Sequence, residues 1–491
     1  MLNRSLESIS RKIDYKKENI FAVTVFNPLS WERTDPATFT WDVEGRPDNH
    51  FRLVDGEGNE IACQLSSRHD GTLPGQDEVL TIDFVAANVP AMGYKTYYLV
   101  PSDKAIRYRT DFINPTTPYE NKFYKVEFGK GGIKSLYDKE LGRQLFDTSK
   151  FNGGELFTLE SVGTGAGEFT DIQQPTMKDY DKLGNYPTVW QCVESGDVYD
   201  VFQIIQPMRD ARITLRVILY KGVKRIDVET AIDGFNGENW REFRLAFPVN
   251  GENSKVAYEV PMGVVEVGKD EIKGAAGFST PRQIYSTPCK EVHPREVQDW
   301  FCSFDGKNGL TISSDVAVFD WINLTDSTDN RVVLQPILLA SRRSCHGEGN
   351  YYLQPGNHKY RFSVYSHEGD WRNGFRYGTQ SNQPLHAVVV NTRLTESAGT
   401  IPETYSFANI DQKSTVISTV KKCDDDNSVI VRCYDMEGKD AEISFSLFKE
   451  VKSVSRTNLI EEEPKPLQTK SDKGFKFKLG HHAIETFKIG M

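Results

Sequence analysis

Between Asn308 and Trp371 the sequence reads NGLTISSDVAVFDWINL (308–324), VVLQPILLASRRSCHGEGNYY (332–352) and NHKYRFSVYSHEGDW (357–371), three β-type apolar runs. In the last run Phe362 and Val364 alternate with polar residues, as in a half-buried strand. A polar insertion, Ser341 to Gly356, separates the last two runs. Loops between long strands are where an all-β scaffold displays polar groups. We therefore predict an all-β protein whose functional groups lie in this insertion.

The composition indicates a globular protein with several domains. The chain has 491 residues, of which 38% are hydrophobic and 11% aromatic. No apolar run approaches the roughly 18 residues that span a bilayer, and the first residues lack the apolar core of a signal peptide. The net charge of −10 disfavours nucleic acid and anionic membranes as partners. None of the seven cysteines forms a CxxC pair, so we expect reduced thiols. The sequence does not determine the cellular compartment, although it slightly favours the cytoplasm.

Four segments follow from the pattern along the chain. In residues 1–19 the apolar stripe Leu2, Leu6, Ile9 and Ile13 predicts a short amphipathic helix. In residues 20–101 strand runs recur about every ten residues, which is typical of a small β-sandwich. Residues 105–390 continue with long alternating runs and no helical pattern of ten or more residues, which predicts one large antiparallel sandwich. Residues 391–491 form a third β unit.

Common catalytic and metal-binding motifs are missing from the sequence. There is no GxxxxGK[ST], no GxGxxG that opens a helix, no HExxH and no GxSxG. A pair of carboxylates could act in glycoside hydrolysis, but one sequence does not show which acidic residues lie close in space. We therefore predict no catalytic residue, no metal site and no cofactor within this chain.

The insertion contains the best candidates for ligand contact, which are Arg342, Arg343, His346 and Tyr351. Arginine donates bidentate hydrogen bonds to hydroxyl or carboxylate oxygens, and aromatic faces stack on sugar rings. The alternative is a solvated loop whose charged residues form structural salt bridges.

Seven phrases along the chain point to a family. They are VFNPLSWERTD (25–35), GKGGIKSLYDKELGRQL (129–145), YEVPMGV (258–264), NGLTISSD (308–315), LASRRS (339–344) with the later NHKYRFSVYSHEGDW, VIVRCYDMEG (429–438) and HHAIETFKI (481–489). In this order they resemble phrases in the β region of glycoside hydrolase family 38, the α-mannosidases. The resemblance implies a small β-sandwich, a large super-sandwich similar to galactose mutarotase and a terminal β unit. It also implies that residues 1–19 are the remnant of a helical bundle.

The resemblance does not extend to the catalytic domain. In that family an N-terminal domain carries a zinc ion, a nucleophilic Asp and the acid/base carboxylate, and its zinc motif is H-x-D followed by an aromatic residue. No H-x-D occurs in these 491 residues. The resemblance therefore implies the non-catalytic C-terminal region of a zinc-dependent retaining α-mannosidase, in which zinc belongs to the complete enzyme. Its implied partners are an α-mannoside or other saccharide and the missing N-terminal catalytic domain. By position, Arg342 and Arg343 match the family's arginines at the rim of the cleft.

Two other interpretations stay open. One is a stand-alone carbohydrate-binding protein, or a mutarotase-like or lyase-like super-sandwich enzyme, with His346, Tyr351 or Tyr352 as its base. The other is a structural module that forms a homo-oligomer. The sequence does not determine the preferred linkage of the sugar.

Overall fold

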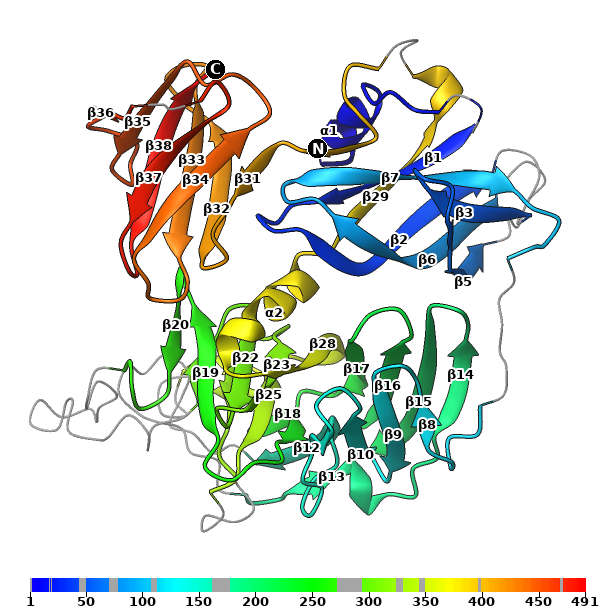
Figure 1. The fold of residues 1–491 in the computed structure, drawn as a ribbon. Coiled ribbons are helices and arrows are strands. Elements are labelled where there is room, and N and C mark those ends of the chain that lie inside the picture. Colours follow the sequence, from blue (N-terminus) through cyan, green and yellow to red (C-terminus); the bar gives the residue numbers. More distant parts are fainter. Residues whose placement is uncertain are drawn as a thin grey trace, which may run out of the picture. The chain divides into compact units, whose positions relative to one another are not determined.

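The computed structural model of the protein describes residues 2–16, 18, 20–43, 50–69, 78–106, 113–160, 177–271, 294–323, 330–343, 349–395, 399–468 and 471–491. The chain folds into two compact units (Figure 1). Unit 1 comprises residues 1–109, 196–198 and 383–491, and unit 2 comprises residues 110–195 and 199–382. This division into two units does not test the boundaries of the four segments predicted from the sequence, which stay a prediction.

Unit 1 contains a β-sandwich of two antiparallel sheets. The larger sheet has the order β29-β1-β7-β3-β4, with β30 on β7, and consists of β1 (Phe21–Asn27), β3 (Phe51–Asp55), β4 (Glu60–Ile61), β7 (Gly93–Pro101), β29 (His386–Asn391) and β30 (Thr404–Ser406). The smaller sheet has the order β2-β6-β5 and consists of β2 (Arg33–Val43), β5 (Cys63–His69) and β6 (Glu78–Val89). Apolar side chains of both sheets, among them Val25, Leu53, Phe39 and Phe84, are buried in one cluster.

The N-terminal helix packs on the other side of the larger sheet. This helix, α1 (Leu2–Ser10), ends earlier than the apolar stripe predicts. Ile13 instead forms a β-bridge with Ile401, and the Lys12 carbonyl accepts a hydrogen bond from the Thr400 backbone. Ile13 is buried in one cluster with side chains from that side of the sheet, among them Ala22, Phe26, Tyr94 and Tyr98. After β29 the chain continues through a 3₁₀ turn, η5 (Thr392–Leu394).

Two further sheets complete unit 1. One has the order β31-β34-β37, with β31 (Ala408–Ile410), β34 (Ala441–Leu447) and β37 (Gly474–Leu479). The other has the order β32-β33-β38-β35-β36, with β32 (Thr415–Lys422), β33 (Val429–Asp435), β35 (Ser453–Thr457), β36 (Lys465–Pro466) and β38 (Ile484–Gly490). Their shared core is rich in aromatic residues and includes Phe445, Phe475, Phe477 and Phe487.

Unit 2 is built on a nine-stranded antiparallel sheet in the order β14-β15-β16-β17-β28-β23-β22-β19-β20. Its strands are β14 (Gln191–Ser195), β15 (Tyr199–Met208), β16 (Ala211–Tyr220), β17 (Ile226–Phe235), β19 (Lys255–Val260), β20 (Gly263–Glu266), β22 (Trp300–Phe304), β23 (Asn308–Ser313) and β28 (Gly356–Glu368). The predicted strand around Phe362 is thus confirmed as β28, which pairs with both β17 and β23.

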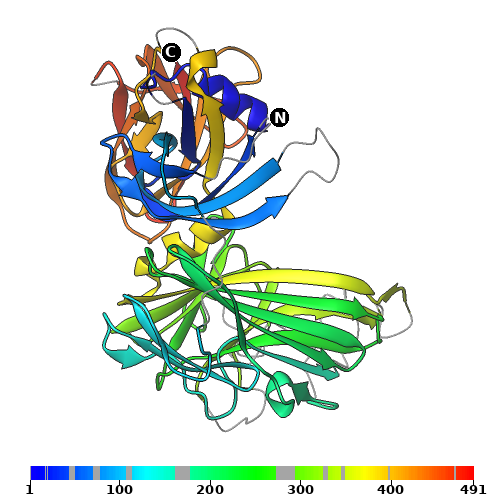
Figure 2. The same cartoon turned by 90° about the vertical axis from the view of Figure 1, so that its right-hand side faces the viewer.

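Three smaller sheets and short helices complete unit 2, whose strands form two main layers (Figure 2). The six-stranded sheet comprises β13 (Asp181–Lys182), β12 (Glu155–Glu160), β18 (Arg241–Pro248), β25 (Val333–Ala340), β24 (Val318–Asp320) and β21 (Arg295–Glu296) in this order. The four-stranded sheet comprises β11 (Arg143–Gln144), β10 (Gly132–Asp138), β9 (Tyr124–Gly129) and β8 (Tyr119–Glu120). A two-stranded sheet pairs β26 (Arg342–Arg343) with β27 (Tyr351–Tyr352). The helical elements are η1 (Leu183–Asn185), η4 (Trp371–Asn373) and α2 (Phe375–Asn382).

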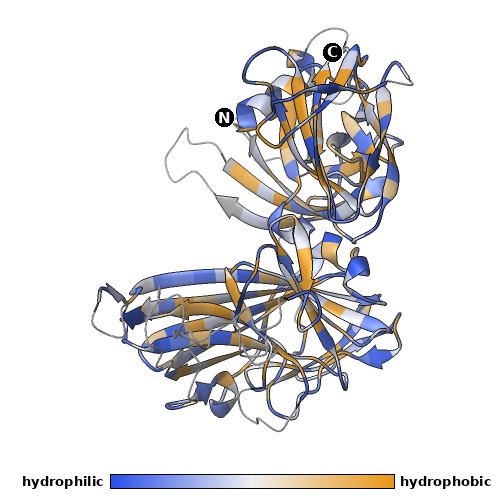
Figure 3. Cartoon of the chain, turned by 90° about the vertical axis from the view of Figure 1, so that its left-hand side faces the viewer, coloured by the Kyte–Doolittle hydropathy of each residue, from blue (hydrophilic) through white to orange (hydrophobic). Residues whose placement is uncertain are grey.

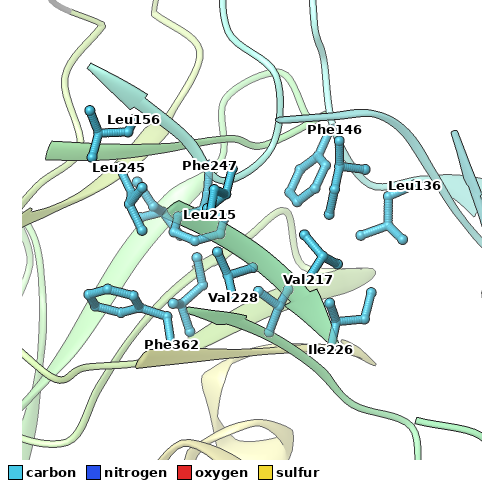
Figure 4. Close-up of a cluster of buried hydrophobic side chains, with 14 of the residues drawn as sticks. Leu136, Phe146, Leu156, Leu215, Val217, Ile226, Val228, Leu245, Phe247 and Phe362 are labelled. Atoms are coloured by element: carbon cyan, nitrogen blue, oxygen red, sulfur yellow. The ribbon is translucent and has the colours of Figure 1, made fainter. Parts of the chain in front are cut away.

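The core of unit 2 lies between its sheets. Figure 4 shows Leu215, Val228 and Phe362 of the nine-stranded sheet facing Leu245 and Phe247 of the six-stranded sheet. Apolar and polar residues therefore alternate along these strands, and Figure 3 shows the alternation as orange and blue segments. The opposite face of the nine-stranded sheet, which we call the outer face, carries mainly polar side chains.

The helix α2 covers part of the outer face and contacts β22, β23 and β28. The sequence pattern does not predict this helix, which has only eight residues. Among the described residues, no helix is long and apolar enough to cross a membrane.

Candidate functional site

The predicted insertion contains a short hairpin formed by β26 and β27. Arg342 pairs with Tyr352, and Arg343 pairs with Tyr351. The fourth candidate, His346, lies outside the described residues. The structure therefore places three of the four predicted site residues on one small element.

The hairpin exposes aromatic surface. Tyr351 and Tyr352 are 57% and 51% exposed, which is unusual for tyrosines in a folded protein. The Arg343 guanidinium lies over the Tyr351 ring, with its carbon 4.6 Å from the ring centroid. The Nε of Arg343 also donates a hydrogen bond of 2.9 Å to the carbonyl of Gly349. A cation–π contact at an exposed site is worth about 0.5–1 kcal/mol, so these two contacts help to hold Tyr351 in a defined position.

Arg342 differs from Arg343 because it points to a buried carboxylate. Its Nη2 donates a 2.6 Å hydrogen bond to Oε2 of Glu242, a fully buried residue on β18. Charge-assisted hydrogen bonds of this kind are roughly twice as strong as neutral ones. Arg342 therefore anchors the hairpin to the six-stranded sheet, as in the alternative that assigns structural salt bridges to the insertion.

Glu242 belongs to a larger buried network of charges. Its Oε1 accepts a hydrogen bond from Nε of Arg244, and Nη1 of Arg244 also donates to Asp320 Oδ2 at 2.8 Å and to Gln335 Oε1 at 3.1 Å. Burial disfavours the charged guanidinium, but Glu242 and Asp320 outweigh this effect, so the pKa of Arg244 lies above its usual value. With Arg342 included, the network joins two arginines and two carboxylates.

Sequence reasoning missed Glu242, Arg244 and Asp320. A signal was present in β18, whose sequence REFRLAFP is buried at every position although it contains three charged residues. Charged residues are almost never fully buried unless they are paired, so charges within such a strand indicate a network. Their partners Asp320 and Arg342 lie far along the chain, and the sequence alone does not identify them.

The hairpin can offer a ligand aromatic faces, phenol hydroxyls and one guanidinium. Sugars are bound in this way, because a ring face stacks on an aromatic side chain while the hydroxyls form hydrogen bonds. Within the described ranges, no group of three or more His, Cys, Asp or Glu residues is placed to hold a metal ion. The exposed rings and the guanidinium of the hairpin therefore fit a role in ligand binding.

Comparison with known proteins gives matches at two levels. Residues 119–299 match the family model described as "Glycosyl hydrolases family 38 C-terminal domain", and residues 414–487 match "Glycosyl hydrolases family 38 C-terminal beta sandwich domain". Together the two matches cover slightly more than half of the chain. No curated protein sequence matches the chain.

Solved structures extend the similarity over nearly the whole chain. A protein in glycosyl hydrolase family 38 from Enterococcus faecalis has a TM-score of 0.74 at 14% identity and covers 99% of this chain, which in turn covers 60% of that protein. An alpha-mannosidase from Enterococcus faecalis V583 also has a TM-score of 0.74 at 14% identity. It covers 99% of this chain, and this chain covers 58% of that enzyme. A galactose mutarotase related enzyme from Lactobacillus acidophilus covers 52% of this chain at 12% identity, with a TM-score of 0.31 that by itself does not establish a shared fold. The chain thus spans about 60% of the length of the first two structures.

Proposed function

Because this chain belongs to the C-terminal region of glycoside hydrolase family 38, we propose that it is the non-catalytic part of a zinc-dependent, retaining α-mannosidase. The complete enzyme would hydrolyse terminal α-mannosyl residues by double displacement. The observation that carries the proposal is the match of two C-terminal family models to separate stretches, in chain order. A structure named as an alpha-mannosidase also aligns over 99% of this chain while extending well beyond it.

The residues described in this chain do not fit a zinc ion. No group of three or more possible ligands is close enough together in the described part of the chain, and the H-x-D motif is missing from the sequence. In this proposal the zinc ion, the nucleophile and the acid/base group belong to the rest of the complete enzyme. This chain contributes a scaffold and part of the rim of the saccharide-binding cleft.

The proposed rim is the hairpin of β26 and β27. Arg343 and Tyr351 would contact the saccharide, because their contact leaves Tyr351 fixed but more than half exposed. Arg342 would act indirectly by fixing the hairpin on Glu242. His346 stays a candidate for the same rim by its place in the sequence.

The first experiment compares the 491-residue chain with the complete gene product. Intact mass of the native product shows whether it exceeds 55.7 kDa. Hydrolysis of 4-nitrophenyl α-mannoside and zinc content are then measured for both proteins. We expect hydrolysis and bound zinc only in the longer protein. Hydrolysis by the 491-residue chain alone would contradict the proposal, and its loss in Tyr351→Phe would support the stand-alone enzyme.

The rim assignment makes a separate prediction for the complete enzyme. Tyr351→Ala should raise KM about two- to tenfold, corresponding to the roughly 0.5–1.5 kcal/mol of an aromatic contact, with little change in kcat. Val189→Ala is the control, because Val189 is also strongly exposed but lies outside the hairpin. An unchanged KM in Tyr351→Ala would remove Tyr351 from the rim.

A further inference from the structure

The outer face of the nine-stranded sheet has a cavity where α2 ends. The cavity measures about 530 Å³, and we call it the Asn382 cavity. Its lining includes Asp299, Ser314, Asp315, Arg361, Ser363 and Asn382. Its volume lies within the range of small-molecule binding sites, about 300–1,000 Å³. All these residues belong to unit 2, and none belongs to the hairpin of β26 and β27.

One wall of the cavity is held by the last residue of α2. The Nδ2 of Asn382 donates to the carbonyl of Ser314 at 2.7 Å and to Oδ1 of Asp299 at 3.1 Å. The backbone N–H of Ser314 donates to the carbonyl of Asp299 at 2.7 Å. The other carboxylate oxygen of Asp299, Oδ2, accepts no hydrogen bond from any described residue. Asp299 is thus fixed in place and keeps one acceptor for a ligand.

A second wall of the cavity contains the guanidinium of Arg361, which other side chains hold in place. Arg361, on β28, donates from Nε to Oδ2 of Asp227 at 3.2 Å and from Nη2 to the hydroxyl of Tyr220 at 3.3 Å. Asp227 is fully buried and also accepts from Nε of Arg225 at 2.7 Å. The Nη1 of Arg361 donates to no described residue, and the side chain is 49% exposed. The Arg361 guanidinium is therefore oriented by a buried carboxylate and keeps one donor nitrogen for a ligand.

A buried glutamate, Glu259, forms a hydrogen bond with the backbone of Asp299 in the first wall. Glu259 is only 5% exposed, and its Oε2 accepts a 3.0 Å hydrogen bond from the backbone N–H of Asp299. Burial, together with the negative charge of Asp299, raises the pKa of Glu259 to about 8. Glu259 is therefore mainly protonated at pH 7, so it does not add a second negative charge beside Asp299. We regard Glu259 as a positioning residue, because it does not line the cavity.

The polar surface continues beyond the Asn382 cavity. A second cavity of about 420 Å³ shares Asp315 and Arg361 with it and extends over Arg216 and Glu229 on β16 and β17. The Asp315 carboxylate accepts a 2.8 Å hydrogen bond from the backbone N–H of Arg361, so this side chain is fixed at the common wall. Across both cavities, four carboxylates (Glu229, Asp233, Asp299 and Asp315) face three basic groups (Arg216, Lys359 and Arg361).

We propose that the two adjoining cavities on the outer face form a binding site for a neutral oligosaccharide, with one sugar unit in the Asn382 cavity. Sugar hydroxyls both donate and accept hydrogen bonds, so they match a lining that alternates carboxylates, amide, hydroxyls and guanidinium. The nearly balanced charge, with one carboxylate in excess, disfavours phosphates and other anions. This site is independent of the proposed function, because the hairpin is anchored on the six-stranded sheet and shares no residue with these cavities.

The test uses saturation-transfer difference NMR on the whole 491-residue protein, with mannobiose, maltotriose and inorganic phosphate as probes. We expect at least one of the two saccharides to bind and phosphate not to bind. Ala317→Trp places a large side chain at an exposed position of the cavity lining and should weaken binding at least tenfold. Asp299→Asn removes a charged acceptor and should weaken binding on the order of tenfold.

Two controls keep the outcome clear. Val189→Trp adds the same bulk at an exposed site outside both cavities and should leave binding unchanged. Thermal unfolding confirms that each variant is folded. The inference is overturned if neither saccharide binds, if phosphate binds as well as the saccharides, or if folded Ala317→Trp binds like the wild type. Binding that is lost in Tyr351→Ala but kept in Ala317→Trp would assign the saccharide to the hairpin and would also overturn the inference.

Discussion

Arg244 is the most completely enclosed positive charge in the described part of unit 2, and its three side-chain partners are all buried. Removing one partner of a buried ion pair leaves buried charge that is no longer compensated, which costs about 3–5 kcal/mol. Arg244→Met should therefore lower the free energy of unfolding by about this amount, measured by urea unfolding. The control is Arg212→Met, because Arg212 is 64% exposed in its pair with Asp233 and should cost at most about 1 kcal/mol. Losses of at most about 1 kcal/mol in both variants would show that Glu242 and Asp320 tolerate the loss of Arg244 at little cost.

Glu259 should make stability depend on pH in the opposite direction from most carboxylates. Its pKa in the folded protein is about 8, whereas a glutamate in an unfolded chain titrates near 4.3. Between about pH 4.3 and 8 the folded protein therefore retains a proton that the unfolded chain has lost, so the free energy of unfolding should fall as pH rises. Glu259→Gln cannot ionise and should gain stability over the wild type, by an amount on the order of a few kcal/mol at about pH 9.

The measurement is urea unfolding of both proteins at about pH 5, 7 and 9. Glu57→Gln, at an exposed turn, is the control and should follow the wild type at each pH. Parallel pH profiles for the wild type and Glu259→Gln would show that Glu259 does not keep its proton in the folded state.

For single residues, the sequence predicts which side chains are buried better than it predicts which residues they contact. Phe362 and Val364 were predicted to face the core from alternation alone, and both are buried there. Arg342 was predicted to lie at the rim of a site, and this stays a prediction, although its guanidinium points to Glu242. Glu259 and Asp299 lie 40 positions apart, and nothing in the sequence pairs them. Polar contacts between distant strands depend on the register of the whole sheet, which local patterns do not encode.

The helix α2 shows the same limit for secondary structure. It has no long apolar stripe, and it forms because it packs on β22, β23 and β28. Gly378 allows this packing, because a Cβ at this position would lie 2.3 Å from Cβ of Trp300. Trp300 is fully buried and stacks on Trp371, with 6.1 Å between the ring centroids. Tertiary contacts therefore decide the position of a segment whose own sequence is weakly helical.

Gly378→Ala should consequently destabilise the protein, although a glycine-to-alanine change inside a helix usually stabilises it by about 0.5–1 kcal/mol. Overpacking costs typically about 1–3 kcal/mol, so we expect a net loss and a lower Tm. Thr379→Ala on the same helix is the control and should have little effect, because Thr379 is only half-buried. A higher Tm in Gly378→Ala would show that α2 can move away from Trp300 at no cost.

For the whole molecule, composition and strand rhythm predicted an all-β chain, and the structure confirms this prediction. The division into units depends on strand pairing that is remote in sequence. In unit 1, β1 pairs with β7 and also with β29, whose residues come after those of unit 2. A local pattern identifies β1 and β29 as strands but does not show that they are neighbours.

Each unit contains a buried thiol that can report on its own unfolding. Burial raises the pKa of Cys302 in unit 2 and of Cys433 in unit 1 to about 12, so neither should react with iodoacetamide while folded. Phe362→Ala removes a ring from the core of unit 2 alone and should cost about 3–5 kcal/mol. We expect alkylation of Cys302 at lower urea in this variant, with Cys433 unchanged, as measured by peptide mass mapping. An equal shift at both cysteines would mean that the units unfold together.

The place of β29 beside β1 also sets an order for synthesis on the ribosome. Residues 102–385 must be made after β7 and before β29 begins, which takes roughly 15–60 s at about 5–20 residues per second. During this time unit 2 can be completed, while one edge of β1 has no partner strand. Because β1 reads FAVTVFN and an unpaired apolar edge invites pairing with other chains, we expect this strand to be open to incorrect pairing until β29 is made.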